Sequence, residues 1–179
     1  NSDAPKLTSH DEIIRHILNR INVDDILVSR GATDHLDHAS PKFAVGGKLG
    51  LDCTGDEIDE LGITILEDSE LLSKMKNISS DIKGLKQYYK DTKNPICVIS
   101  VEKTRSQKYL FEELKPLFSH IKILVIVDEK ANDLENPYML IWRVTNNMDS
   151  SRDLYIEGNT ICLDGTNKNS LDGFTRRWP

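Results

Sequence analysis

Apolar residues near the start of the chain recur at the spacing of one helix face. Ile13 and Ile17 lie four positions apart, and further isoleucines and leucines follow at helical spacing. Ser9 and Glu12 form the pattern of a capping box, so the helix is predicted to begin just after Ser9. A short apolar run over residues 26–28 then predicts a buried strand.

The second half of the chain alternates short apolar runs with helical patterns. The runs predict four strands, over residues 96–101, 121–127, 154–156 and 160–163. Helices are predicted after Ser106 and after Asn136, where Pro137 stands at the first helical position and its missing N–H costs nothing. The side chains expected to face inward from the later helix are Met139, Ile141, Trp142 and Val144. Strands that alternate with helices predict an α/β fold with a mixed, largely parallel sheet flanked by helices.

The middle of the chain separates two regular parts. Residues 57–94 are charged and have a helical tendency, for example over residues 79–89. We therefore expect a first half-unit with a Gly- and His-rich loop at residues 1–66, a helical connector at 67–94 and a second α/β half-unit at 95–179. These boundaries follow the change from irregular, charged sequence to regular apolar runs.

The two half-units resemble each other. In each, a helical pattern ends in Arg and Asn and leads through an Asp-containing turn to an apolar strand, over residues 18–28 and 142–156. Leu-Asp-Cys-Thr at 51–54 is matched by Leu-Asp-Gly-Thr at 163–166, and the first half-unit carries the extra residues 31–50. A degenerate duplication explains the match, and chance similarity between two short α/β units is the alternative.

Composition and charge limit the classes of function. The chain has 23 Lys+Arg and 29 Asp+Glu, a net charge of −6, and nucleic-acid interfaces need clustered basic residues instead. No apolar run approaches the roughly 20 residues of a membrane-spanning helix, and residues 1–6 lack the apolar core of a signal peptide. Three cysteines without close spacing argue against a disulfide framework. We expect a soluble, cytoplasmic protein with no membrane span and no nucleic-acid partner.

Two histidines stand close together in the irregular segment. If residues 34–38 were helical, His35 and His38 would share a face, as metal ligands can. Two imidazoles are too few for a closed zinc site, and the sequence places no third ligand. Ordinary hydrogen bonds are the alternative. A metal-dependent hydrolase built around His35 and His38 is one hypothesis.

A glycine-rich segment offers candidate cofactor-binding residues, namely Gly46, Gly47 and Lys48. It lacks the phosphate-loop order, because Leu49 occupies the position of the hydroxyl that would contact magnesium. Backbone amides beside Lys48 could hold an anion. The alternative is a tight turn in which the glycines let two backbones approach. A free-standing anion- or phosphate-binding module that uses the loop at 31–54 is therefore a second hypothesis.

A few further residues are candidates for chemistry. Asp128 and Glu129 follow a predicted parallel strand, where open α/β sheets place ligands, although solvated carboxylates are the alternative. Cys97 lies inside an apolar run and is expected in the core. Arg176 and Trp178 could bind an anion or pack on the sheet, and a chain that stops beside Trp178 suggests an excised piece.

These segments together resemble the C-terminal part of the UbiD-like decarboxylases, the family that includes 3-octaprenyl-4-hydroxybenzoate carboxy-lyase. The matching stretches are residues 26–31, 36–41 (Leu-Asp-His-Ala-Ser-Pro), 46–54 (Gly-Gly-Lys-Leu-Gly-Leu-Asp-Cys-Thr), 123–128, 141–143, 148–153, 163–168 and 173–178. The resemblance covers about two thirds of the chain and is weak over residues 55–94. It is closest to the longer members, which look like they carry a second, degenerate copy of this unit.

The resemblance implies non-oxidative decarboxylation of an aromatic, hydroxybenzoate- or naphthoate-like acid in ubiquinone or menaquinone biosynthesis. The family uses prenylated FMN and a divalent metal, and its catalytic Arg-Glu-Glu set and metal ligands belong to a preceding domain. No stretch here matches those motifs, and Tyr138 stands near the place of a family lysine that contacts the cofactor phosphate. The resemblance therefore implies a C-terminal domain that is structural or oligomerising, inactive alone, free of cofactor and partnered by an upstream catalytic domain in a homo-oligomer.

Overall fold

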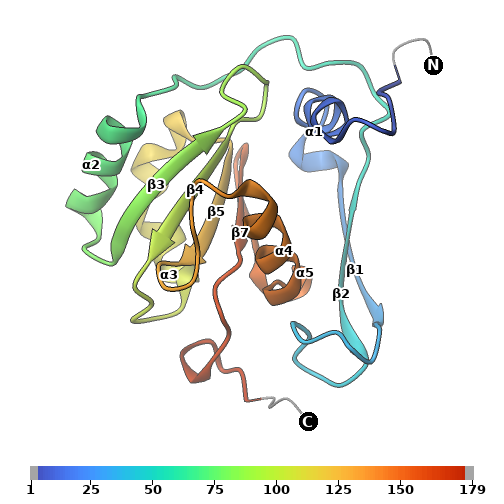
Figure 1. Ribbon diagram of the computed structural model, residues 1–179, viewed down its shortest axis with the longest axis vertical. Helices are drawn as coiled ribbons and strands as arrows, with labels where there is room; N and C mark the ends of the chain where they lie inside the picture. The colour runs from blue at the N-terminus through green and yellow to red at the C-terminus, as the bar shows by residue number, and fades with distance from the viewer. Residues whose placement is uncertain (1–3, 176–179) are drawn as a thin grey trace.

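The computed structural model describes residues 4–175 and consists of a five-stranded sheet with helices on both faces, beside a two-stranded hairpin (Figure 1). The helices are α1 (His10–Leu18), α2 (Asp68–Ile78), α3 (Gln107–Glu113), α4 (Pro137–Asn147) and α5 (Ser150–Asp153). The strands are β1 (Ile26–Ala32), β2 (Val45–Leu51), β3 (Ile82–Tyr88), β4 (Ile96–Val101), β5 (Ile123–Asp128), β6 (Leu154–Glu157) and β7 (Thr160–Asp164). Short 3-10 helices span Val23–Asp25, Lys115–His120 and Ser170–Asp172.

The large sheet confirms the mixed α/β class. Its order is β3-β4-β5-β7-β6, in which β4, β5 and β7 are parallel and the two edge strands are antiparallel. Side chains alternate across β5, so Leu124 and Ile126 face a core formed with α2 and α3, while Val125 and Val127 face a core formed with α1 and α4. Burial on both faces explains the uninterrupted apolar run of this strand.

Two predicted helix starts are confirmed. The Ser9 hydroxyl accepts the Glu12 N–H at 3.3 Å at the start of α1. The Asn136 side chain accepts the Met139 N–H at 3.1 Å, and Pro137 opens α4. Each cap satisfies one of the backbone N–H groups that a helix start leaves without an intrahelical partner.

Two expectations about local structure were wrong. The helical tendency over residues 79–89 gives way to strand β3, because pairing with β4 outweighs local propensity. Part of the expected connector is thus an edge strand of the large sheet, while the domain boundaries themselves stay a prediction. The strand at 26–28 is not buried, since Leu27 is 67% exposed on a hairpin that carries no further strand among the described residues.

The inward face of α4 also differs from the prediction. Val144 is buried as predicted, together with Leu140 four positions before it, whereas Met139, Ile141 and Trp142 are 37%, 54% and 57% exposed. An unbroken apolar run over 139–142 favours no single helix face, so the sequence could not select the inward one.

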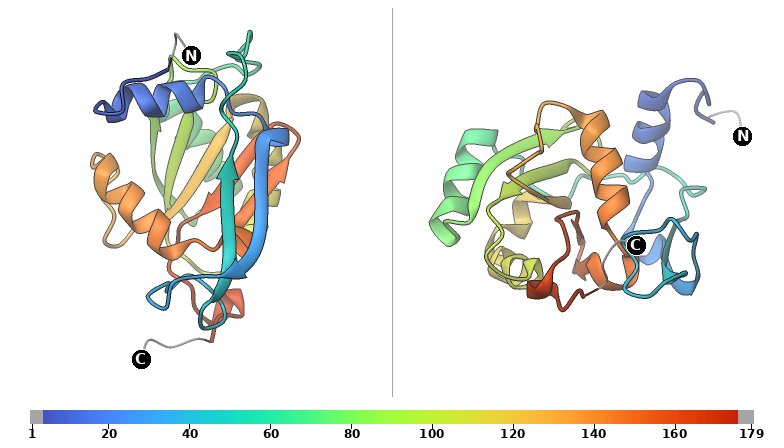
Figure 2. Two further views of the ribbon diagram at one scale, coloured as in Figure 1. Left: turned by 90° about the vertical axis from the view of Figure 1, so that its right-hand side faces the viewer. Right: turned by 60° about the horizontal axis from the view of Figure 1, so that its bottom comes forward.

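The internal similarity is visible in the backbone. Both half-units run from a helix through a short helical turn into an antiparallel hairpin, as α1–β1–β2 and α4–α5–β6–β7 (Figure 2). Ile26 pairs with Leu51 in the first hairpin, and Leu154 pairs with Leu163 in the second.

The same turn ends both hairpins. The Asp52 carboxylate accepts the Thr54 N–H at 3.0 Å and hydroxyl at 2.7 Å. The Asp164 carboxylate accepts the Thr166 N–H at 3.0 Å and hydroxyl at 2.6 Å. The two Asp-x-Thr segments therefore adopt one local structure, as a duplication predicts.

Candidate functional site

A cluster of buried charges lies at the carboxyl ends of the parallel strands, where α/β sheets usually bind ligands. The Lys103 ammonium donates to the Thr166 hydroxyl at 2.9 Å and to the Asp172 carboxylate at 2.6 Å. The Lys168 ammonium lies 3.0 Å from the Asp164 carboxylate and 3.6 Å from that of Asp153. The side chains of these two lysines and three aspartates are all 6% exposed or less.

The cluster is closed, and a third cation, Arg152, lies 2.6 Å from the Asp153 carboxylate, so its three aspartates are matched by three positive charges. Each lysine faces at least one carboxylate, so neither ammonium is available to bind an external anion without breaking a buried pair. Asp128, at the end of β5, accepts the Asn167 N–H at 2.7 Å, and burial raises the pKa of its carboxyl. These contacts fasten the segment after β7 onto the strand ends, which is a structural role. The sequence pattern indicated Asp128 at this edge but not the buried lysines and the other aspartates, although Lys and Asp residues directly after strands were a usable signal.

The glycine-rich segment is strand β2 and not a loop. The Gly47 N–H donates to the Asp149 carboxylate at 2.9 Å. A side chain at Gly47 would place its Cβ 2.4 Å from the Ser151 nitrogen, and one at Gly46 would place it 2.7 Å from the Ser40 Cβ. Gly47 therefore lets two backbones approach, as the alternative expected, but within a strand and not in a tight turn. Its amide, next to Lys48, already donates to a carboxylate.

The two histidines lie in the connection between β1 and β2, which is not helical there. The rings of His35 and Phe43 are 4.9 Å apart. Among residues 4–175, no three His, Cys, Asp or Glu side chains gather closely enough to hold a metal ion. The shared helix face on which a metal site at His35 and His38 depended is absent from this segment.

The thiols are poor nucleophiles. Cys97 and Cys162 are buried in the large sheet, and burial raises the pKa of both. Burial and the nearby Asp52 also raise the pKa of the half-buried Cys53. At neutral pH all three sulfurs are protonated, so none is poised for attack on a substrate.

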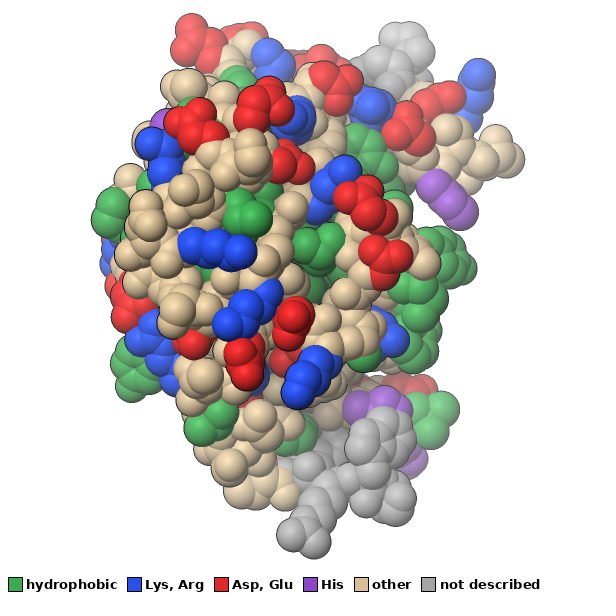
Figure 3. Space-filling view, turned by 60° about the vertical axis from the view of Figure 1, so that its left-hand side comes forward, with side chains coloured by type: hydrophobic (Ala, Val, Ile, Leu, Met, Phe, Trp, Pro, Cys, Tyr) green, Lys and Arg blue, Asp and Glu red, His purple; other side chains and the backbone are tan. Residues whose placement is uncertain are grey.

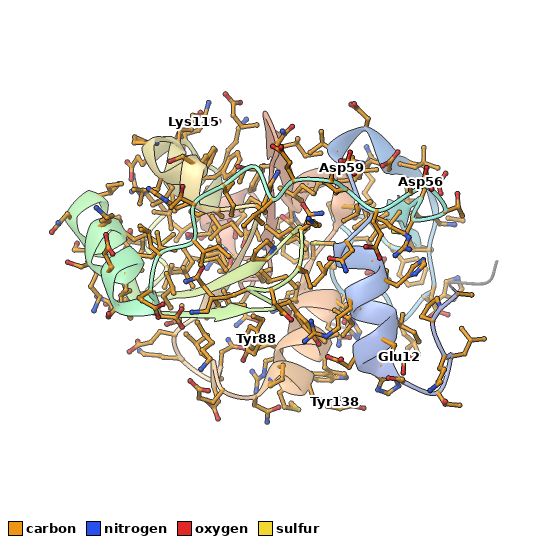
Figure 4. The ribbon with its side chains drawn as sticks, turned by 90° about the horizontal axis from the view of Figure 1, so that it is seen from above. Glu12, Asp56, Asp59, Tyr88, Lys115 and Tyr138 are labelled. Atoms are coloured by element: carbon orange, nitrogen blue, oxygen red, sulfur yellow. The ribbon has the colours of Figure 1, made fainter. Side chains whose placement is uncertain are left out.

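An apolar groove of about 320 Å³ lies between the two half-units. Its walls include Ile14 of α1, Leu49 and Leu51 of β2, and Leu140 of α4, with Tyr88 of β3 nearby. Figure 4 shows Tyr88 on the inner side of α4 and Tyr138 on its outer side. No charged side chain lines the groove, although a flavin phosphate needs cationic or free amide donors. The groove therefore does not fit a flavin nucleotide.

The face of the molecule that carries α2 and β3 has no large patch of one charge sign (Figure 3). Lysines and arginines alternate there with aspartates and glutamates (Figure 3). Among the described residues, no helix is long and apolar enough to cross a membrane. The terminal Arg176 and Trp178 lie outside the described residues.

Comparisons with known proteins identify relatives of the chain. The family model for the 3-octaprenyl-4-hydroxybenzoate carboxy-lyase C-terminal domain matches residues 2–53 and 62–173. Uncharacterized proteins of Helicobacter pylori strains 26695 and J99 are 44% and 43% identical over the whole chain. The chain spans 29% of the length of each of these relatives.

A solved structure with a similar fold is that of a UbiD-class enzyme. An evolved dimeric form of HmfF from Pelotomaculum thermopropionicum, in complex with prenylated FMN, is similar at a TM-score of 0.51 and 22% identity, over 63% of this chain and 26% of that chain. Vanillic acid decarboxylase of Sedimentibacter hydroxybenzoicus matches at a TM-score of 0.46 and 17% identity, over 55% of this chain and 25% of that chain. The fold agrees with the family model, and the chain belongs to the UbiD family, as a C-terminal domain of the 3-octaprenyl-4-hydroxybenzoate carboxy-lyase type.

Proposed function

We propose that this chain is the C-terminal part of a cytoplasmic carboxy-lyase that decarboxylates an aromatic, hydroxybenzoate- or naphthoate-like acid in quinone biosynthesis. The prenylated FMN, the divalent metal and the reacting groups belong to the upstream part of the protein. The chain itself is structural, contributes contacts between subunits of a homo-oligomer, and is inactive alone.

The observation that carries this proposal is the match of the family's C-terminal domain model to nearly the whole chain. The described residues support a structural role for this chain, with the reacting groups in the upstream part of the protein. The charges at the strand ends are paired and buried, and the wall residues of the groove carry no charge. An anion-binding module is less well supported, because the Gly47 amide already donates to Asp149.

The outer side of α4 supports the oligomer contact. Tyr138 and Trp142 stand four positions apart and are 75% and 57% exposed, while Ile141, 54% exposed, lies at the border with the groove. Exposed aromatic and aliphatic side chains on one helix face are typical of protein–protein interfaces.

The activity test uses the full-length protein, co-produced with a flavin prenyltransferase, and the isolated 179-residue chain. We expect the full-length protein to release CO₂ from an aromatic hydroxy acid, and the isolated chain to release none and to retain no flavin. Turnover or stoichiometric flavin in the isolated chain would contradict the proposal.

The assembly test compares two exposed aromatic residues in the full-length protein. Trp142→Ser on α4 should lower the mass measured by light scattering after size exclusion, whereas Tyr109→Ser on α3, where the side chain is 63% exposed, should leave it unchanged. An unchanged mass for Trp142→Ser removes α4 as the subunit contact.

A further inference from the structure

The two related hairpins differ in what lies beside them. In the second, β7 pairs with β6 on one side and with the parallel strand β5 on the other. In the first, β2 pairs with β1 alone among residues 4–175. Figure 2 shows the other edge of β2 on the side of the molecule that carries α4. The strand that occupies the place of β7 thus has an open edge.

The matched Asp-x-Thr turns show which residues of the two hairpins correspond. Because Asp52 corresponds to Asp164, Leu51 corresponds to Leu163 and Leu49 to Ile161. The Asp52 N–H donates to the Asp25 carbonyl of the β1 side at 3.0 Å. Amide direction alternates along a strand, so the N–H groups of residues 49, 51 and 53 point away from β1.

The corresponding amides in the second hairpin are those that bind β5. The Ile161 N–H donates to the Lys122 carbonyl and the Gly165 N–H to the Ile126 carbonyl, both at 2.9 Å. The open amides of Leu49 and Cys53 occupy the same register positions. The edge of the first hairpin is therefore arranged to receive a parallel strand over residues 49–53.

One face of the first hairpin is also uncovered. Leu27 corresponds to Tyr155, and Tyr155 packs with its ring centroid 5.7 Å from that of Phe111 on α3. Leu27 itself is 67% exposed, on the face of β1 opposite the one that lines the groove with Ile26. An element like α3 is missing at this face among the described residues, together with the strand that would precede it.

We propose that, in the longer protein, a strand upstream of this chain pairs with β2 in parallel, in the place that β5 takes beside β7. The chain spans 29% of its Helicobacter relatives, so most of such a protein lies outside it. The occupant is an apolar strand buried on both faces, like β5, and it ends in a carboxylate that accepts the Gly55 N–H, as Asp128 accepts the Asn167 N–H.

A second copy of the chain fits the edge less well. If two β2 strands paired antiparallel about a twofold axis, amides on both sides of the centre of β2 would have to bind the partner. The Gly47 amide is not free to do so, because it already donates to Asp149. The open stretch begins at Leu49 and runs toward Gly55, which suits a parallel neighbour that continues past the end of β2.

Hydrogen exchange in the full-length protein, read at single residues by mass spectrometry, tests this. We expect the Leu49 and Leu51 amides to exchange on the order of 1000-fold slower than unstructured amides, and the Ile161 and Leu163 amides of β7 to do the same. The Gly50 and Asp52 amides, which face β1, are internal controls for the hairpin.

Fast exchange at Leu49 and Leu51 beside protected Gly50 and Asp52 would overturn the proposal, and so would fast exchange at all four. Protection that disappears when the protein is diluted assigns the edge to a second copy and also overturns it. The readout needs no activity, so an inactive protein with protected edge amides refutes the proposed reaction and leaves this inference standing.

Discussion

The two Asp-x-Thr turns have the same hydrogen bonds and very different surroundings. Asp164 is 1% exposed and lies 3.0 Å from the buried Lys168 ammonium, whereas Asp52 is exposed at the end of a hairpin with one open edge. The local sequence therefore determines the structure of the turn, while the elements packed around it determine how much the turn contributes to stability.

The largest expected effect is the difference in stability between variants at these two aspartates. Asp164→Asn removes the nearer of the two carboxylates beside the buried Lys168 ammonium and leaves only Asp153, at 3.6 Å, to compensate it, which should cost about 3 kcal/mol. Asp52→Asn removes the same charge at the surface, where the amide oxygen can still accept from Thr54 and no buried ammonium loses a partner, so it should lower the free energy of unfolding far less. Urea unfolding of both variants checks this, and equal losses would show that burial does not distinguish the two turns.

Core packing gives the second contrast. Ile126→Ala in β5, where the side chain is fully buried, should cost about 3 kcal/mol in the free energy of unfolding because of the cavity it leaves. Leu27→Ala in β1 should change the free energy of unfolding of the 179-residue chain by less than about 0.5 kcal/mol. A loss at Leu27 as large as that at Ile126 would mean that the first hairpin is covered in the isolated chain.

Two glycines of β2 provide a smaller contrast. Gly47→Ala should cost about 2 kcal/mol, because its Cβ would lie 2.4 Å from the Ser151 nitrogen and force β2 away from α5. Gly50→Ala meets its nearest atom at 3.6 Å, the Leu27 Cβ, and should be nearly neutral. Thermal unfolding of the pair measures the difference, and similar melting temperatures would disprove the close approach at Gly47.

The pH dependence of stability should differ in sign between the half-units. Hydrogen bonds from Thr54 lower the pKa of Asp52, so its stabilisation is present above the unfolded pKa of 3.8 and is lost as the pH falls through the folded value. Burial raises the pKa of Asp128, so ionisation destabilises the fold and stability from this group rises as the pH falls from neutral toward 3.8.

Melting temperatures of Asp52→Asn and Asp128→Asn against pH check these signs. Asp128→Asn should differ from the parent most at neutral pH, and the difference should shrink toward pH 4. Asp52→Asn should lose its difference from the parent only below that range. Parallel curves for both variants would contradict the assigned directions.

Much of the fold could be predicted because its signals are local. A strand buried on both faces, such as β5, is apolar from residue 123 to residue 127, and caps such as Ser9 and Asn136 act within three residues. Strand β3 could not be predicted, because its lysines and glutamine resemble a charged helix until β4 pairs with it. Long-range pairing decides such segments.

The candidate site was predicted less well for the same reason. Lys103 and Asp172 are separated by 69 positions, and nothing in the sequence pairs them. From the sequence alone, Gly46 and Gly47 could form an anion site or allow two backbones to approach closely. The contact between Gly47 and Asp149, 102 positions later, decides between these alternatives. Sites built from distant segments need the topology before the residues can be assigned.

An experimental structure of the full-length, flavin-loaded protein tests the account most directly. We predict a parallel strand from upstream residues hydrogen-bonded to the Leu49 and Leu51 amides, and a flavin phosphate bound entirely by the preceding part of the protein. A structure in which β2 remains an edge strand, or in which Lys48 binds the flavin phosphate, would contradict it.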